Sequence, residues 1–430
     1  MKSEIEHTST TLGNQDMKSS QRMVSVVEPY ELPEGWTWCR LGEVADWGSG
    51  GTPSRKNPEY YQGSIPWIKT GELNETYIFD SEEKVSEDAI KHSSAKIFPK
   101  ETVVMAMYGA TIGKTAIFGI DASTNQACAC AICHKELDNH FLFNFLKSKK
   151  DYFLYNAKGG AQPNISQEII KNTLIPLPPT LAEQQRIVKR IESMFAKLDE
   201  AKEKAQNVVD GFETRKAAIL HKAFTGELTA KWRKENGVCD DSWEEKTIGE
   251  CLIAISDKYD PQKDKIDGVQ YIGLENIEAN GGIISTGDVS SVKSIKTLFK
   301  NNDLLYGKLR PYLNKHDIVE FDGICSTDIL VYRSKPEYEI KFFNYLFSQN
   351  CFIQYAIENS NGINLPRTSE KNISAYSQKI PTLPEQVEIV RILDIIIEKE
   401  NKAKQAAEAV LEQIDLLKKS ILARAFRGEL

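Results

Sequence analysis

The segment YGATIGKT, residues 108–115, carries the residue types of a loop that binds nucleotide phosphates. Such a loop has the spacing G-x-x-x-x-G-K-[S/T], whose length lets successive backbone N–H groups surround a phosphate. Here Gly109 and Gly113 are one residue too close, and Tyr108 stands where the first glycine should be. The corresponding run in the second half of the chain, residues 307–315, contains no Gly-Lys-Thr. We therefore predict a loop between two strands, and a nucleotide-dependent enzyme remains an alternative.

The segment CACAICH, residues 128–134, contains C-x-x-C-H, which is a haem-attachment pattern and also half of a zinc site. Haem attachment requires export, and no second Cys/His pair follows nearby to complete a zinc site. The small apolar run NQACACAIC is typical of a buried strand, in which free cysteine acts as a small hydrophobe. The six histidines show no H-x-x-x-H spacing, and no Ser/His/Asp arrangement stands out. We predict no catalytic centre, no metal site and no cofactor in this chain.

The composition is that of a globular protein of two or three domains, with 430 residues, 41% hydrophobic and 27% charged. The sequence has no run of about 18 apolar residues, so we expect no membrane span. The polar N-terminus lacks the apolar core of a secretion signal, and we read it as a mobile arm. We therefore expect a cytoplasmic protein whose eight cysteines are reduced.

An internal repeat organises the chain. Residues 179–228 align without a gap with residues 381–430, at an offset of 202, and 20 of the 50 aligned positions are identical. The matches include PTLAEQQRIV with PTLPEQVEIV, and ILHKAFTGEL with ILARAFRGEL. A duplication of this length indicates two equivalent structural units and carries more weight than any short motif.

The repeated segment has a heptad pattern, with apolar or small residues at alternating steps of four and three. In the first copy these are Ile187, Ile191, Met194, Leu198, Ala201, Ala205, Val208 and Phe212. In the second they are Ile389, Leu393, Ile396, Ala403, Ala407, Val410, Ile414, Leu417 and Ile421, with Glu400 as the one break. About five heptads predict a coiled coil. Prolines before each segment, and Gly226 and Gly428 after it, delimit two helices of about 40 residues and about 60 Å.

The simplest partner of one helix is the other copy, and homodimerisation through either helix is the alternative. The segments before the helices, about 30–178 and 240–380, resemble each other weakly, and each closes with an aromatic helix, at 141–153 or 341–356. Short alternating strands with few helices predict α+β domains. The predicted organisation is an arm at 1–29, globular domains at 30–180 and 237–382, and helical regions at 181–236 and 383–430.

Several longer motifs resemble the specificity subunit, HsdS, of type I restriction–modification systems. They are GSGGTPSRKNPEYYQGSIPWIKTGEL (48–73), AMYGATIGKTAIFG (106–119), STNQA (123–127), GGAQPNIS (159–166), IPLPPTLAEQQRIV (175–188), KAFTGELTAKWR (222–233) and RAFRGEL (424–430). The resemblance covers residues from about 30 to 430. The second half departs from the pattern, because it lacks the GGTP segment and replaces the AQPN turn with GINLPRT at 362–368.

The resemblance implies a chain that is not itself an enzyme. Two target-recognition domains would each read one half of an asymmetric bipartite site in double-stranded DNA. Two antiparallel coiled-coil helices, related by a pseudo-two-fold repeat, would set the spacer between the half-sites. Two methyltransferase subunits, which bind S-adenosylmethionine, would dock on the chain, and restriction/translocase subunits, which use ATP and Mg, would join them. Two DNA-reading domains joined by rigid helices would impose a fixed distance between the two half-sites, as paired DNA-binding modules do.

Base readout in the major groove uses Arg or Lys against guanine and Asn or Gln against adenine. In the first domain the predicted DNA-binding residues are Ser49, Gly50, Thr52, Ser54, Arg55, Lys69, Thr70, Tyr108, Thr111, Lys114, Lys158, Gln162 and Asn164. In the second they are Lys308, Arg310, Tyr312, Asn314, Asn361, Asn364 and Arg367.

The net charge of −7 is unusual for a DNA-binding protein, although a local basic surface is compatible with it. We therefore expect the methyltransferase subunits to supply much of the phosphate contact. The isolated chain should bind DNA poorly and be only marginally soluble. A coiled-coil scaffold whose globular domains bind proteins is the alternative from a different functional class.

Overall fold

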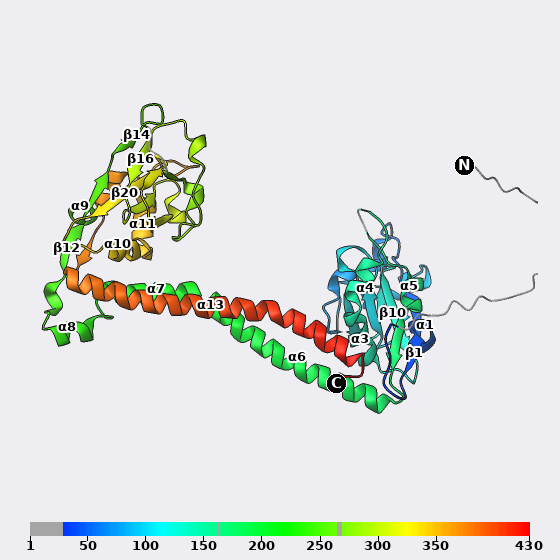
Figure 1. Cartoon of the computed structure of the whole chain (residues 1–430). Helices are drawn as coiled ribbons and strands as arrows, with labels where there is room; N and C mark the ends of the chain where they lie inside the picture. The colour runs from blue at the N-terminus through cyan, green and yellow to red at the C-terminus, as the bar shows by residue number, and fades with distance from the viewer. Residues whose placement is uncertain (1–28, 161–162, 265–268) are drawn as a thin grey trace, which may run out of the picture. The chain divides into compact units, whose positions relative to one another are not determined.

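The computed structural model describes residues 29–160, 163–264 and 269–430 (Figure 1). They form two compact units. The first unit comprises the described residues up to Asp199 together with Asp415–Leu430, and the second unit comprises those within Glu200–Ile414. No helix in these described ranges is both long enough and apolar enough to cross a membrane.

The first unit contains a sheet in the order β2-β10-β7-β8-β4, a second sheet in the order β5-β3-β9-β6, and the pair β1-β11. The central strands of the first sheet are buried on both faces, which is why they read as continuous apolar runs such as VVMA. The strands are β1 Thr37–Arg40, β2 Ala45–Ser49, β3 Ile65–Ile68, β4 Tyr77–Ile78, β5 Glu83–Val85, β6 Ile97–Phe98, β7 Val103–Ala106, β8 Thr115–Phe118, β9 Ala122–Thr124, β10 Cys128–Cys133 and β11 Leu174–Leu177.

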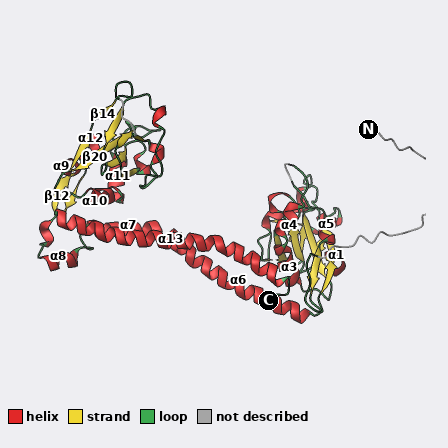
Figure 2. Cartoon of the chain, in the orientation of Figure 1, coloured by secondary structure: helices red, strands yellow, loops and turns green. Residues whose placement is uncertain are grey.

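The second unit contains sheets in the orders β13-β20-β17-β18 and β14-β16-β19-β15, and the pair β12-β21 (Figure 2). Its strands are β12 Glu244–Thr247, β13 Leu252–Ile255, β14 Lys258–Tyr259, β15 Gln270–Ile272, β16 Lys296–Phe299, β17 Leu304–Gly307, β18 His316–Ile318, β19 Gly323–Cys325, β20 Ile329–Ser334 and β21 Ser377–Ile380. Both units share a parallel pair, β3 with β9 and β15 with β19. The fourth strand of this sheet lies at opposite edges, because β5 pairs with β3 in the first unit and β14 pairs with β16 in the second. The shared topology agrees with the sequence repeat and with a mixed helix and strand fold.

Each predicted aromatic helix is divided in two by a short break. The first unit has α3 Asn139–Ser148 and α4 Lys150–Tyr155, and the second has α10 Ile340–Phe347 and α11 Asn350–Glu358. The remaining short helices are α1 Leu41–Val44, α2 Glu87–Lys91, α5 Gln167–Asn172, α8 Ala230–Asn236, α9 Ile248–Cys251 and α12 Glu370–Ser374.

The long helical segments are α6 Leu181–Asp210, α7 Phe212–Phe224 and α13 Leu383–Ala425. The first predicted helix is therefore interrupted at Gly211, whereas the second is continuous. At this break Arg215 donates to the carbonyl of Val208 (2.9 Å) and to the carboxylate of Glu400 (2.8 Å). A Cβ on residue 211 would lie 2.4 Å from the Arg215 guanidinium, so glycine makes room for this side chain. Glu400, the break in the predicted seam, is thus a charge partner of Arg215.

Within each unit, α13 runs antiparallel to the segment it contacts. In the first unit Arg186 donates to the carbonyl of Leu430, and Lys418 pairs with Asp199 at 2.5 Å. In the second unit Arg215 pairs with Glu400, and Arg233 pairs with Glu385 at 2.6 Å. In each unit, residue numbers rise along one segment as they fall along the other. Figure 1 shows α7 beside the first part of α13.

The predicted seam holds for the first copy but is displaced by one residue along part of α13. Ala403, Val410 and Leu417 are exposed, whereas Lys404, Leu411 and Lys418, one residue further on, are half-buried. The two lysines at these positions place their ammonium groups over aromatic rings, in cation–π contacts. Lys404 Nζ lies 4.8 Å from the ring centroid of Phe212 in the second unit, and Lys418 Nζ lies 5.2 Å from that of Phe195 in the first.

In each unit, the phenylalanine of the repeated AFxGEL motif packs against the aromatic helices of that unit. Phe426 packs edge-on against Phe141 and Phe145, with ring centroids 5.1 and 5.2 Å apart. Phe224 packs against Phe342 at 5.0 Å. Gly226 and Gly428 then adopt positive φ (81° and 75°), as expected for residues that end a helix.

Candidate nucleic-acid interface

In the first unit, the turn between β7 and β8 carries Tyr108 and the segment that resembles a phosphate loop. Gly109 and Gly113 have φ of 64° and 78°, which allows a tight 3-10 turn over Gly109–Thr111. A strand follows this turn, as predicted, whereas a phosphate loop opens a helix. The structure therefore offers no support for the nucleotide-binding alternative.

This turn is joined to the loop that precedes α5. The Gly109 N–H donates to the carbonyl of Pro163 (2.8 Å), and Tyr108 forms a β-bridge with Asn164. Lys158 and Asn164 close the second loop by exchanging two backbone hydrogen bonds of 2.8 Å. The two loops thus form one surface edge, called the first composite edge, which brings together Tyr108, Thr111, Lys114, Lys158 and Asn164.

The second unit repeats this arrangement between β17 and β18. The Arg310 N–H donates to the carbonyl of Pro366 (2.7 Å), and Leu309 forms a β-bridge with Arg367. Asn361 and Arg367 exchange backbone hydrogen bonds of 2.9 and 2.8 Å. This second composite edge brings together Lys308, Arg310, Tyr312, Asn361, Asn364 and Arg367. Arg310 and Asn314 occupy the left-handed positions that Gly109 and Gly113 hold in the first unit, with φ of 54° and 44°.

The other predicted cluster of the first unit surrounds a carboxylate. Glu83 pairs with Arg55 (2.6 Å) and with Lys69 (3.1 Å), and Lys69 also pairs with Glu82 (3.0 Å). The hydrogen bond from Arg55 lowers the pKa of Glu83, and the hydrogen bond that Lys69 donates to Glu82 raises the pKa of Lys69. The Arg55 guanidinium also lies over the Tyr61 ring, 4.0 Å from its centroid. Both predicted contact cations are therefore held in place by acidic partners.

The loop before this cluster is anchored by Trp67, whose indole N–H donates to the carbonyl of Gly51 (3.0 Å). Thr52 and Ser54 are exposed, and the Thr52 hydroxyl donates to Gln126 at 2.5 Å. Ser49 accepts a hydrogen bond from Gln167 of α5, which links this loop to the first composite edge. Thr70 is half-buried where a 3-10 turn begins.

A model of the type I restriction modification DNA specificity domain matches residues 33–209 and again residues 240–413. The chain belongs to this family. The specificity subunit of the type I restriction enzyme EcoDI of Escherichia coli is 26% identical over 320 residues, which are 68% of this chain and 70% of the relative. That of EcoKI, from Escherichia coli strain K12, is 25% identical over 434 residues, 93% of this chain and 90% of the relative.

The fold is similar to the crystal structure of the HsdS subunit from Thermoanaerobacter tengcongensis. The TM-score is 0.64 at 20% identity, and the match covers 94% of this chain and 99% of that one. The predicted family resemblance is therefore confirmed, and the function of the chain is DNA sequence specificity in a type I restriction–modification system.

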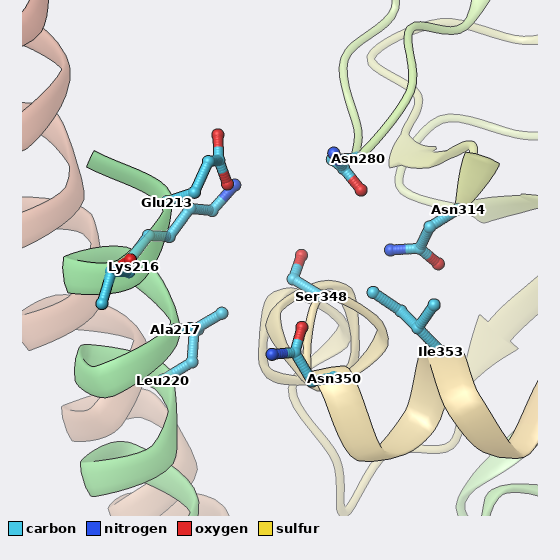
Figure 3. A pocket seen from close by; sticks show the side chains of 10 residues that line it. Glu213, Lys216, Ala217, Leu220, Asn280, Asn314, Ser348, Asn350 and Ile353 are labelled. Carbon is cyan, nitrogen blue, oxygen red and sulfur yellow. The ribbon is translucent and has the colours of Figure 1, made fainter. Parts of the chain in front are cut away.

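In these specificity domains, two of the residues predicted to contact DNA are buried. Asn314 is 1% exposed, and its Nδ2 donates to the carbonyl of Phe347 (3.0 Å). It lines a pocket of about 360 Å³ with Lys216, Ser348 and Asn350 (Figure 3). Gly50 is buried, and a Cβ there would lie 1.9 Å from the carbonyl oxygen of Thr124. Both predictions are corrected, because these residues support the loops from inside. Gln162 lies outside the described residues.

Sequence reasoning missed the acidic and apolar members of these surfaces. Asp328 pairs with Arg367 at 2.9 Å, much as Glu83 pairs with Arg55. Ile363 and Leu365 are 100% and 54% exposed on the second composite edge. Their side chains are neither cations nor amides, which are the groups that most often read guanine and adenine, so base-readout chemistry did not predict them. Apolar residues between Gly362 and Pro366 belong to no helical or strand pattern, and this is the feature of the sequence that could have indicated their exposure.

The cysteine-rich segment is the strand β10, with Cys128 and Cys130 both 0% exposed, as predicted for a buried strand. Burial raises the pKa of the Cys130 thiol to about 12. Within the described ranges, no group of three or more His, Cys, Asp or Glu side chains is placed to hold a metal ion.

Proposed function

We propose that the two globular domains, 30–180 and 237–382, each read one half of an asymmetric bipartite site in double-stranded DNA. One observation carries this proposal: in each domain two loops far apart in sequence are joined by the same backbone bridge into one composite edge. The edges carry different side chains, Tyr108, Lys158 and Asn164 in one and Arg310, Tyr312 and Arg367 in the other. Different side chains at equivalent positions of the same fold imply that the two domains read different half-sites.

We further propose that α6 and α7 form with α13 an antiparallel coiled coil that sets the spacer. Support comes from the numbering of the contacts within each unit. The pairs Asp199–Lys418 in the first unit and Arg215–Glu400 in the second join these helices, and their residue numbers add up to 617 and 615. One antiparallel register would give a constant sum. With the repeat offset of 202, such a register would have its pseudo-two-fold axis near residues 207 and 409.

The long helices also offer surfaces for the methyltransferase subunits. On α13, Val387, Ile395 and Val410 are 40–49% exposed in the second unit, and Leu416 and Leu417 are 67% and 47% exposed in the first. We propose that two methyltransferase subunits, carrying S-adenosylmethionine, cover such residues, and that restriction subunits using ATP and Mg join them. In this assembly the chain supplies recognition and has no catalytic role of its own.

The decisive experiment is to produce the full chain with its methyltransferase partner in an unmethylated host and to sequence the methylated bases of the genome. The expected result is one asymmetric motif in two parts separated by a fixed gap. Exchanging the loop 361–367 for that of a relative should change one half of the motif and leave the other half unchanged. A change in both halves, or a motif without a gap, would contradict the proposal.

The spacer function has its own test. Residues 204–210 and 406–412 are equivalent by the repeat and face each other in the proposed register, so deleting both removes a matched heptad. Seven helical residues span about 10 Å, which is the length of about three base pairs. The gap should shorten by about that number while both half-sites stay the same. An unchanged gap would refute the spacer function and leave the reading function intact.

A further inference from the structure

The loop at the second composite edge presents apolar side chains to solvent. Asn361 and Arg367 close the loop through their backbone hydrogen bonds, and Gly362 turns the chain with φ of 104°. Ile363 then projects with its side chain 100% exposed, and Leu365 is 54% exposed. Isoleucine is among the residue types most often buried in folded proteins, so a fully exposed one beside a leucine calls for a physical reason.

The fold itself does not supply this reason. A fully exposed side chain contributes no buried apolar area, so Ile363 is not required for packing in the second unit. The adjacent polar groups are those of a DNA-reading surface, with Asn361 and Asn364 on either side of Ile363 and Arg310 held to Pro366 on the neighbouring loop. The ligand of this surface must therefore offer an apolar group among hydrogen-bonding ones.

The major groove of DNA offers such a group in the 5-methyl of thymine. An A·T pair presents N7 and N6 of adenine, which asparagine can bind with two hydrogen bonds, and beside them the thymine methyl, which apolar side chains contact. A loop with isoleucine between two asparagines matches this combination. The minor groove offers no methyl group, and phosphates favour the cations instead.

We propose that Ile363 reads the 5-methyl group of a thymine in the half-site of the second domain, with Leu365 beside it. This inference rests on the proposed function, because it requires the second domain to read bases. The first domain has Gly160 at the equivalent place in its loop, counted from the matching pairs Lys158–Asn164 and Asn361–Arg367. The first domain therefore lacks this methyl contact.

The test replaces each thymine of the methylation motif in turn by deoxyuridine, which lacks only the methyl group. Affinity for the full chain with its methyltransferase partner is then measured by competition gel shift. Removing one buried methyl should weaken binding about four-fold at one thymine, from the roughly 0.8 kcal/mol assigned to a buried CH₂ group. Ile363→Ala should bind the thymine and deoxyuridine duplexes equally at that position. Ile284→Ala, a change at another exposed isoleucine (60%) of the same unit, should keep the four-fold difference.

A reciprocal variant tests gain of the contact. Gly160 lies outside the left-handed region, and a Cβ there meets no atom of the described residues within 4 Å, so Gly160→Ile is the matching substitution in this loop. It should raise the preference for thymine over deoxyuridine at one position of the first half-site. The inference is overturned if the wild-type complex tolerates every deoxyuridine, if Ile363→Ala retains the discrimination, or if the half-site of the second domain contains no thymine. A complex with no preference for its own motif would instead refute the proposed function.

Discussion

Replacing Arg310 by glycine should stabilise the second unit while weakening its reading of DNA. Arg310 has φ of 54° and ψ of 64°, in the position where the first unit has Gly109. Left-handed backbone costs a non-glycine residue about 1–2 kcal/mol, and glycine returns roughly 0.5–1 kcal/mol of this through its larger unfolded-state entropy. The Arg310 side chain is exposed and makes no hydrogen bond or ion pair within the described part of the chain.

The net effect of Arg310→Gly on stability should therefore be a gain of about 0.5–1 kcal/mol. For a unit of this size, that raises Tm by about 1–4 °C. If the guanidinium binds a guanine through two hydrogen bonds, its loss costs about 1–3 kcal/mol, which is about a 5- to 150-fold loss of affinity at one base pair. Backbone strain at a position that glycine would relieve is the sign of a side chain retained for function.

The assay combines calorimetry with competition binding on the complex with the methyltransferase partner. Arg310→Ala is the matched control, because it removes the guanidinium but keeps the strained backbone, so Tm should stay constant while the same affinity is lost. A lower Tm for Arg310→Gly would refute the account of strain. Unchanged discrimination in both variants would refute base reading, and an equal loss on all sequences would mark a phosphate contact.

Three further predictions concern carboxylates and a buried histidine. Glu385→Gln should destabilise the second unit by about 1.5–3 kcal/mol in chemical denaturation, because Glu385 is 0% exposed and its carboxylate accepts buried hydrogen bonds from Arg233 and Thr229 that lose their ionic character in the amide. Glu83→Gln should raise affinity for random DNA and steepen its salt dependence, because Arg55 loses its acidic partner and Lys69 keeps only Glu82. Burial lowers the pKa of His316 to about 4, so the unfolded chain takes up the proton first. The contribution of His316 to the free energy of unfolding should be greatest above about pH 6.5. It should fall by about 3 kcal/mol toward pH 4, as measured by urea unfolding.

Each of these predictions has a control within the chain. Glu183 occupies the position equivalent to Glu385 but pairs with Arg186 on the surface of its own helix, so Glu183→Gln should cost less than about 1 kcal/mol. An equal cost at both positions would contradict the role of burial. Glu87→Gln, at an exposed ion pair with Lys91, should leave random-DNA binding nearly unchanged. His316→Gln should remove the pH dependence between 6.5 and 4, and an unaltered slope would assign it to other groups.

The amino-acid sequence alone determined the features that are local or repeated. The 202-residue duplication, the long helices, the buried strand of Cys128 and Cys130 and the glycines that end the helices all follow from the types of nearby residues. Local periodicity records which face of an element is apolar, so it predicts elements well. The same information identified the turn at Tyr108 as a connection between strands.

Tertiary structure decided which distant segments meet and which side chains they hide. Two bridges join loops that are far apart in sequence, Tyr108 with Asn164 and Leu309 with Arg367. The positions of these loops are set by separate strands and helices, so a local sequence pattern does not predict that they meet. Burial of Asn314 and Glu385 depends likewise on neighbours from elsewhere in the fold. In the displaced seam of α13, Lys404 and Lys418 make cation–π contacts with aromatic rings, which a pattern of apolar residues does not count. Contacts between residues far apart in sequence are properties of packing in three dimensions, so only the folded chain fixes them.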